Sequence, residues 1–158
     1  VQEYKDKKIM IYAFNIDSHE VIEEEMKKIG RKPVIISGKV KTKDRYSIQK
    51  EFNEGEADIC ISNIKKSINL YGAEVCILYD NDPSPAKVTQ IVGRIDRGID
   101  EKERTYIMMY YSDSPEESYF VNVTAERAQS SRDFTKDVKY AVDEFAELWR
   151  NRNNKGER

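Results

Sequence analysis

The chain has 158 residues, of which 35% are charged, and its formal net charge at pH 7 is -2. This length suits one domain with a substantial core, while the nearly balanced charge excludes a uniformly basic surface, so any basic binding surface must be local. The apolar runs are only a few residues long and no signal peptide is apparent, so we expect no membrane partner.

The chain holds two cysteines, Cys60 and Cys76, which lie in apolar runs and form no C-x-x-C motif. This usage predicts buried thiols in a reducing compartment. We expect the cytoplasm, or the host cytoplasm for a viral protein, with the nucleus as an open alternative. His19 is the single histidine and lies in the first turn of a predicted helix, so we expect no metal site and no histidine-based catalytic pair.

Five short apolar runs predict β-strands, because they are rich in β-branched and aromatic residues. These runs cover residues 8–14, 33–37, 57–62, 74–80 and 104–111. The first run is continuous rather than alternating, which is typical of a strand buried on both faces.

Helices are predicted in the first two intervals between these strands. The first helix starts at a cap formed by Asp17 and Ser18 and ends at Gly30. Its apolar positions recur at helical spacing and are Val21, Ile22, Met26 and Ile29. The second helix is capped by Thr42 and ends near Gly55. Its apolar positions are Tyr46, Ile48 and Phe52.

Strands that alternate with helices predict βαβ units, so we expect an α/β fold with a mainly parallel sheet and helices on both faces. Ligands of such sheets bind beyond the carboxyl ends of the strands. Ser37, Ser62 and Asp80 lie at predicted strand ends, and the loops that follow them form the expected working surface.

The C-terminal part of the chain has a different pattern. A helix is predicted over residues 116–127, and from Asp133 onward apolar residues recur with a period near 3.6. These residues are Phe134, Val138, Ala141, Phe145, Leu148 and Trp149. We expect residues 131–158 to form an amphipathic helix with a basic tail, packed on the sheet domain over residues 1–130 or extending from it. A docking helix for a missing neighbour is the alternative.

One stretch carries a distinctive polar pattern, Q-x-x-G-R-x-x-R, from Gln90 to Arg97. On a helix, Gln90, Gly93, Arg94 and Arg97 share one face. Two guanidinium groups beside a glycine suit a nucleotide phosphate. The spacing alone favours the alternative of a solvated helix face, whose arginines pair with neighbouring carboxylates.

Three patterns follow one another in the chain, at residues 62–70, 80–85 and 90–97. In this order and spacing, residues 9–111 resemble the second, C-terminal RecA-like domain of superfamily 2 helicases and translocases, most closely the Swi/Snf-type ATPases. Residues 62–70 resemble motif V, and the pair Asn69-Leu70 is typical of the Swi/Snf branch. Residues 90–97 resemble motif VI. Two further segments support the resemblance: residues 8–15 resemble the motif IV strand, and residues 45–55 resemble a segment that commonly reads R-x-x-x-I-x-x-F-N-x-G.

The resemblance implies a RecA-like three-layer sandwich with a C-terminal helical extension. It also implies that Arg94 and Arg97 are arginine fingers that reach the γ-phosphate of ATP. The nucleotide, with Mg²⁺, would be held mainly by an N-terminal RecA-like domain of the same polypeptide. Gln90 and Gly93 would face the same cleft, and Asn69 would link that cleft to the arginines.

The resemblance further implies a nucleic acid partner, for which we expect DNA. Hydroxyl groups and backbone amides suit phosphates without reading sequence, and lysines add salt-dependent affinity. The residues expected to contact nucleic acid are Ser37, Gly38, Lys39, Lys41, Ser62, Lys65 and Lys66.

No phosphate-binding G-x-x-x-x-G-K-[ST] loop occurs in the chain, so we expect half of an ATPase that is inactive alone. The alternative is a degenerate, non-catalytic RecA-like module that binds nucleic acid or protein. Three departures from the family patterns support that alternative: Ser67 replaces a glycine in motif V, the loop before it is one or two residues short, and Asp96 lies between the two arginines.

Overall fold

A computed structural model of the chain describes residues 1–63, 68–80, 91, 104–109 and 114. Val1–Asp80 and Gln90–Met109 belong to one compact unit, whose described residues form a sheet and its covering helices. The other unit covers Asn81–Thr89 and Tyr110–Arg158. Ser114 is its single described residue, so the predicted C-terminal helices and the boundary near residue 130 lie outside the described part.

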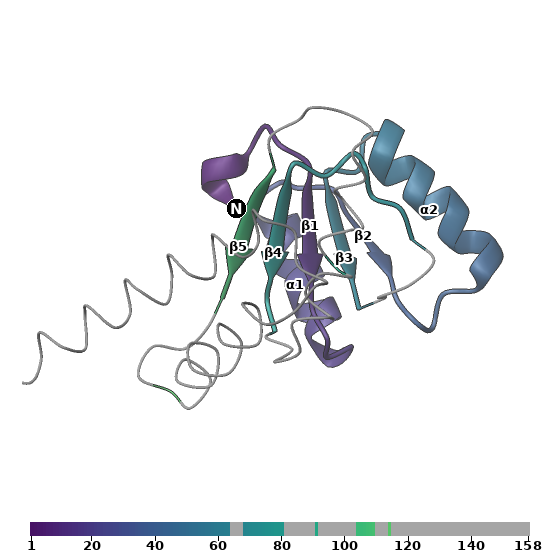
Figure 1. Ribbon diagram of the computed structural model, residues 1–158, viewed down its shortest axis with the longest axis horizontal. Coiled ribbons are helices and arrows are strands. Elements are labelled where there is room, and N and C mark those ends of the chain that lie inside the picture. The colour runs from purple at the N-terminus through teal and green to yellow at the C-terminus, as the bar shows by residue number, and fades with distance from the viewer. Residues whose placement is uncertain (64–67, 81–90, 92–103, 110–113, 115–158) are drawn as a thin grey trace, which may run out of the picture. The chain divides into compact units, whose positions relative to one another are not determined.

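The described strands form one five-stranded sheet in the order β2-β3-β1-β4-β5 (Figure 1). Their bounds are β1 (Ile9–Tyr12), β2 (Pro33–Ile36), β3 (Ile59–Ser62), β4 (Val75–Leu78) and β5 (Thr105–Met108). Every neighbouring pair is parallel. The five predicted strands and the parallel sheet are therefore confirmed, with each strand shorter than its apolar run.

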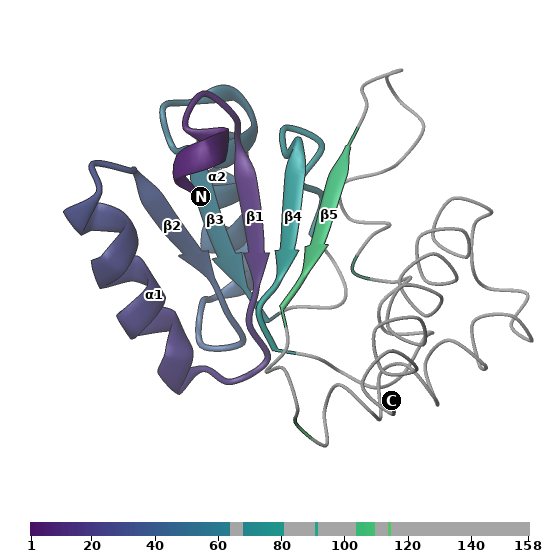
Figure 2. The same cartoon turned by 90° about the vertical axis from the view of Figure 1, so that its left-hand side faces the viewer.

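Two helices cover opposite faces of this sheet, α1 (Asp17–Lys28) and α2 (Thr42–Glu54) (Figures 1 and 2). On the α1 face, Ile22 packs in a core cluster with strand residues. That cluster includes Ile9, Ile11, Ile59, Ile61, Val75 and Ile77. On the α2 face lie the alternate positions, such as Met10 and Cys76, which are also fully buried. Burial on both faces explains why the first run is continuous, and it confirms the three-layer α/β fold.

The start of α1 is held by a neighbouring side chain and not by its own first residues. Asn15 Oδ1 accepts a hydrogen bond from the backbone amide of Asp17 at 3.1 Å. The helix makes no side-chain cap from its N-cap residue, Ile16, so the predicted cap at Asp17 and Ser18 is wrong. The predicted end is confirmed, because Gly30 follows the helix with a φ of 78°, a conformation that glycine adopts without strain.

The start of α2 also differs from the prediction. Thr42 is the first helical residue, Lys41 is the N-cap, and no side-chain cap bond is made. At the other end, the ammonium group of Lys8 donates to the carbonyls of Phe52 at 2.5 Å and Gly55 at 2.8 Å. A cation at these carbonyls is favourable because they form the negative end of the helix dipole.

One predicted core position of α2 is wrong. Phe52 is fully buried, but Tyr46 is 73% exposed. Since Tyr46 lies six positions before Phe52, the two side chains leave α2 in directions more than a right angle apart. Only the direction of Phe52 points at the sheet.

Both cysteines are free and buried, as predicted. Burial raises the pKa of the Cys60 thiol, and it raises the pKa of Cys76 to about 12. His19 is also buried, and its Nε2 donates to the carbonyl of Ala13 at 2.8 Å. Within the described ranges, no cluster of three or more His, Cys, Asp or Glu side chains could hold a metal ion, and no helix has the length and apolar character to span a membrane.

Candidate functional site

The carboxyl ends of all five described strands meet at one edge of the sheet, because every pair is parallel (Figure 2). Six of the residues predicted to have a function are described. They are Ser37, Gly38, Lys39, Lys41, Ser62 and Asn69. The other six, Lys65, Lys66, Gln90, Gly93, Arg94 and Arg97, lie outside the described residues.

The β2–α2 loop, residues 37–41, is a tight turn at this edge. The buried Ser37 side chain accepts a hydrogen bond from the amide of Lys39 at 3.3 Å, and the carbonyl of Ser37 accepts one from Val40 at 3.1 Å. Gly38, Lys39 and Lys41 are exposed. Ser37 therefore shapes the loop from inside, while the glycine and the two lysines form its outer surface.

Arg45, in the first turn of α2, holds the β2–α2 loop against the helix. Its Nε donates to the carbonyl of Val40 at 2.9 Å, and its Nη2 lies 3.5 Å from the carbonyl of Gly38. Arg45 lies in the segment that resembles the family, but its sequence position alone suggested no role for it. Neither Lys39 nor Lys41 forms an ion pair within the described part of the chain, so both ammonium groups remain available to an anion.

Ser62, the last residue of β3, is fully buried. Its hydroxyl donates to the carbonyl of Ile36 at 2.8 Å, which joins the ends of β3 and β2. This geometry gives Ser62 a role in the sheet and offers no exposed hydroxyl, so a nucleic acid contact by Ser62 stays a prediction without geometric support.

The Asn69 segment, residues 68–72, is hydrogen-bonded to α2 through its backbone. The amide of Asn69 donates to Oε1 of Gln49 at 2.7 Å. The side chain of Asn53 donates to the carbonyl of Asn69 at 2.9 Å and accepts from the amide of Gly72 at 3.0 Å. The Oδ1 atom of Asn69 itself is buried and has no hydrogen-bond partner among the described residues.

The close approach of this segment to α2 requires a glycine. A Cβ atom on Gly72 would lie 2.9 Å from the Cα of Asn53, closer than carbon atoms pack. Beside it, the hydroxyl of Tyr71 donates to the Glu54 carboxylate at 2.7 Å. That hydrogen bond raises the pKa of Tyr71. The Asn69 segment is thus anchored to α2 by successive turns of the helix.

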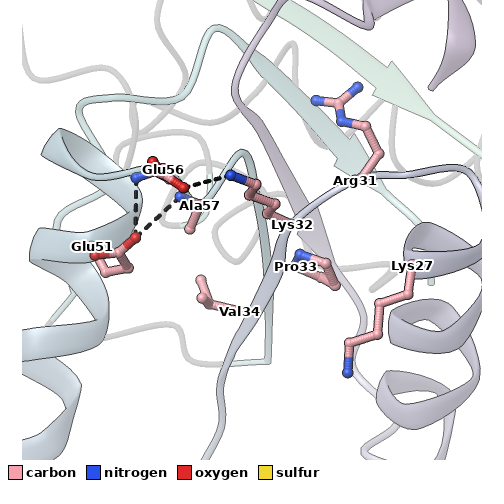
Figure 3. A pocket seen from close by; sticks show the side chains of 8 residues that line it. All are labelled: Lys27, Arg31, Lys32, Pro33, Val34, Glu51, Glu56 and Ala57. Atoms are coloured by element: carbon pink, nitrogen blue, oxygen red, sulfur yellow. Dashed lines mark hydrogen bonds and ion pairs between the residues drawn. The ribbon is translucent and has the colours of Figure 1, made fainter.

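A separate pocket lies at the amino ends of β2 and β3 and has a volume of about 320 Å³ (Figure 3). Its lining residues are Lys27, Arg31, Lys32, Pro33, Val34, Glu51, Glu56 and Ala57. Each basic side chain of the pocket forms an ion pair: Lys27 with Glu23, Arg31 with Asp58, and Lys32 with Glu56. The hydrogen bond between Lys32 and Glu56 raises the pKa of the lysine and lowers that of the glutamate.

The remaining carboxylate of this pocket is satisfied as well. Glu51 Oε1 accepts the backbone amides of Glu56 at 3.0 Å and Ala57 at 3.3 Å (Figure 3). Since its charged groups are used within the fold and none of the predicted functional residues lines it, the pocket is structural and the candidate site is the carboxyl edge.

Residues 1–99 match the helicase conserved C-terminal domain, and the chain belongs to this family. The match spans the β2–α2 loop, the Asn69 segment and the stretch from Gln90 to Arg97. In a comparison with curated protein sequences, no protein matches the chain.

Solved structures show the same fold. The C-terminal part of the Fun30 ATPase domain has a TM-score of 0.70 and 21% identity, over 91% of this chain and 49% of that one, so the chain spans about half of its length. The C-terminal domain of the DEAD-box protein Dbp5 has a TM-score of 0.62 and 16% identity, over 87% of this chain and 82% of that one. S. cerevisiae Dbp5 bound to RNA and ADP BeF3 has a TM-score of 0.61 and 16% identity, over 89% of this chain and 39% of that one. The chain is a C-terminal RecA-like domain of the superfamily 2 helicase class.

Proposed function

We propose that the chain is the C-terminal motor domain of a nucleic-acid-dependent ATPase, a helicase or DNA translocase. The observation that carries the proposal is the family match, which includes both arginines of the stretch from Gln90 to Arg97. In this proposal Arg94 and Arg97 act on ATP and Mg²⁺ held mainly by an N-terminal RecA-like domain of the same polypeptide. Gln90, Gly93 and Asn69 belong to the same nucleotide cleft.

The chemistry follows from where charge develops. During phosphoryl transfer, negative charge spreads over the oxygens of the γ-phosphoryl group, and a guanidinium fork placed there stabilises the transition state. Such a finger contributes on the order of 10³ or more in rate. Because the fingers and the nucleotide belong to different domains, hydrolysis requires closure of the two domains, and the opening and closing would move them along a strand.

The nucleic acid contact rests on the β2–α2 loop. Its exposed Lys39 and Lys41 suit a phosphate backbone, since both lie free of ion pairs within the described residues. Lys65 and Lys66 belong to the same proposed surface. The similar Dbp5 structure is bound to RNA, whereas the Asn69-Leu70 pair resembles the Swi/Snf-type ATPases, and we propose DNA on that ground. The free buried thiols support a reducing compartment such as the cytoplasm or nucleus.

The decisive experiment measures ATP hydrolysis by the full-length protein with DNA, with RNA and without nucleic acid. Arg97→Ala is expected to lower kcat by roughly 10³-fold while DNA affinity is unchanged. Arg97→Lys, which keeps the charge but loses the planar fork, is expected to remain impaired. Lys28→Ala on the exposed side of α1 serves as the control. Near-normal hydrolysis by Arg97→Ala would show that Arg97 is not a finger.

The second candidate function is the non-catalytic module, supported by Ser67 and Asp96. In that case the full-length protein should bind nucleic acid and hydrolyse no ATP. Arg97→Ala should then bind nucleic acid as the wild type does. Stimulated hydrolysis by the wild type excludes this candidate, and its absence excludes the motor.

A further inference from the structure

Three polar residues form a row along α2. Arg45, Gln49 and Asn53 are four positions apart, so their side chains lie on one ridge of the helix. The Nε2 of Gln49 donates back to the carbonyl of Arg45 at 3.3 Å, which orients the amide of Gln49. The three residues are linked through the backbone of α2, which carries all of them.

The row holds two segments that lie on opposite sides of it along the chain. Arg45 binds the carbonyls of the β2–α2 loop. Gln49 and Asn53 bind the backbone of the Asn69 segment on both sides of the Asn69 residue and at Gly72. The absence of a side chain on Gly72 brings the two backbones into near contact. A displacement of the loop that moves α2 must therefore move the Asn69 segment as well.

The side chain of Asn69 differs from its backbone in hydrogen bonding. Both backbone groups are hydrogen-bonded to α2, whereas its Oδ1 atom is buried without a partner in the described part of the chain. Buried polar atoms usually have a hydrogen-bond partner, so this oxygen is free to accept a bond from a group that the described residues do not supply. α2 thus fixes the position of an acceptor that the described fold does not use.

We infer that Gln49 and Asn53 are positioning residues that couple the nucleic acid site on the β2–α2 loop to the nucleotide cleft at Asn69. The inference rests on the proposed function. Nucleic acid that binds Lys39 and Lys41 fixes the loop, the loop fixes α2 through Arg45, and α2 sets the position of Asn69. Gln49 stands where the segment that residues 45–55 resemble commonly has isoleucine, so its hydrogen bond is a feature of this chain's own sequence.

The test uses the full-length protein and four substitutions. Gln49→Met keeps the size of the side chain and removes the acceptor for the Asn69 amide, whereas Gln49→Glu keeps that acceptor and loses only the donor to the Arg45 carbonyl. Asn53→Leu removes both of its hydrogen bonds with little change in volume. Tyr71→Phe is the matched control, because it breaks the neighbouring hydrogen bond to Glu54 and leaves those of Asn69 intact.

The measured quantity is the coupling between DNA binding and ATP hydrolysis. We expect Gln49→Met and Asn53→Leu to lower the stimulation of ATP hydrolysis by DNA about fivefold or more, with basal hydrolysis and the KM for ATP without DNA nearly unchanged. Because linkage between two binding sites is reciprocal, the gain in DNA affinity on adding a non-hydrolysable ATP analogue should shrink by a similar factor. Gln49→Glu and Tyr71→Phe should retain wild-type coupling.

Two results would overturn the inference while the proposed function stands. In the first, Gln49→Met keeps full stimulation by DNA. In the second, basal and stimulated hydrolysis fall together, which is the result of a purely structural role. The comparison of Gln49→Met with Gln49→Glu tests the inference even where Asn53→Leu fails to fold. A wild-type protein that shows no DNA-stimulated hydrolysis overturns the proposed function itself, and the inference with it.

Discussion

The backbone amide of Asn15 donates a hydrogen bond to the carboxylate of Asp80 at 2.9 Å, across 65 positions of the chain. Asn15 follows β1 and Asp80 follows β4, so this bond joins the ends of two neighbouring strands at the carboxyl edge. The side chain of Asn15 in turn accepts the first amide of α1. One carboxylate therefore fixes both the start of α1 and the point at which the chain leaves β4.

Replacement of Asp80 by alanine is expected to lower the free energy of unfolding by about 1 kcal/mol, because the Asn15 amide loses a charged acceptor at an exposed site. Asp80→Asn keeps an acceptor oxygen and should lose less. Urea unfolding curves for the two variants measure this difference. Equal stability of Asp80→Ala and the wild type would show that water replaces the carboxylate without loss.

The ion pair between Arg31 and Asp58 is expected to matter far more than a neighbouring one. The Arg31 side chain is 7% exposed and also donates to the carbonyls of Tyr4 and Lys7. Arg31→Met removes the cation from the Asp58 carboxylate, which keeps only the amide of Lys32, and removes a donor from each carbonyl, so the expected loss is about 3 kcal/mol.

The matched control is the adjacent pair of Lys32 and Glu56, whose side chains are 61% and 81% exposed. Lys32→Gln should leave the free energy of unfolding nearly unchanged, because solvent screens this exposed pair. Thermal unfolding of both variants provides the comparison, and losses of similar size would contradict the role given to burial.

Two glycines are expected to respond differently to replacement by alanine. They are Gly72, which lies against α2, and Gly38, which lies in the β2–α2 loop. Gly72→Ala places a methyl group against the backbone of Asn53, and the expected loss is about 1–3 kcal/mol. Gly38→Ala meets no atom within 4 Å and should leave stability unchanged.

Gly38→Ala therefore separates fold from function. A change in DNA affinity at unchanged melting temperature would support close approach of a phosphate backbone to the β2–α2 loop. Loss of stability in Gly38→Ala, or its absence in Gly72→Ala, would count against the packing described for these two positions.

The buried thiols are expected to stay protonated at alkaline pH. The pKa of Cys76 rises from 9.0 to about 12 because burial disfavours the thiolate. The stabilisation from this raised pKa is complete below about pH 9, where the unfolded thiol is still protonated, and is lost as the pH rises toward 12.

The corresponding measurement is alkylation of Cys60 and Cys76 in the native protein, read by peptide mass spectrometry. Labelling should remain low between roughly pH 7 and 9, although an ordinary thiol becomes largely reactive over that interval. Labelling in denaturant should be fast at both positions. Rapid native labelling that follows an ordinary thiol titration would contradict their burial.

The strands were predictable because their residues report burial directly. Continuous β-branched runs such as residues 8–14 need two covered faces, and the sheet has them. The helix details were less accessible. Thr42 and Tyr46 satisfied local rules for a cap and an apolar stripe, but the direction of α2 is set by Phe52 and by its bonds to the Asn69 segment, which come from distant parts of the chain.

The candidate site shows the same limit. The exposed lysines of the β2–α2 loop were found from their place after a strand, because parallel sheets bind ligands there. Ser62 has the same placement, yet its hydroxyl satisfies the carbonyl of Ile36 inside the sheet. The row of Arg45, Gln49 and Asn53 had a signal, since polar residues four positions apart mark one helix ridge. Their partners could not be identified without the geometry.

The position of β1 has a consequence for biosynthesis. β1 is the first strand of this sheet in chain order, but its two neighbours in the sheet, β3 and β4, are translated later. A nascent chain that stalls before Ile59 therefore carries a wholly apolar strand with both edges open, a state prone to self-association. Chaperone demand should accordingly peak before the middle of the domain has been translated.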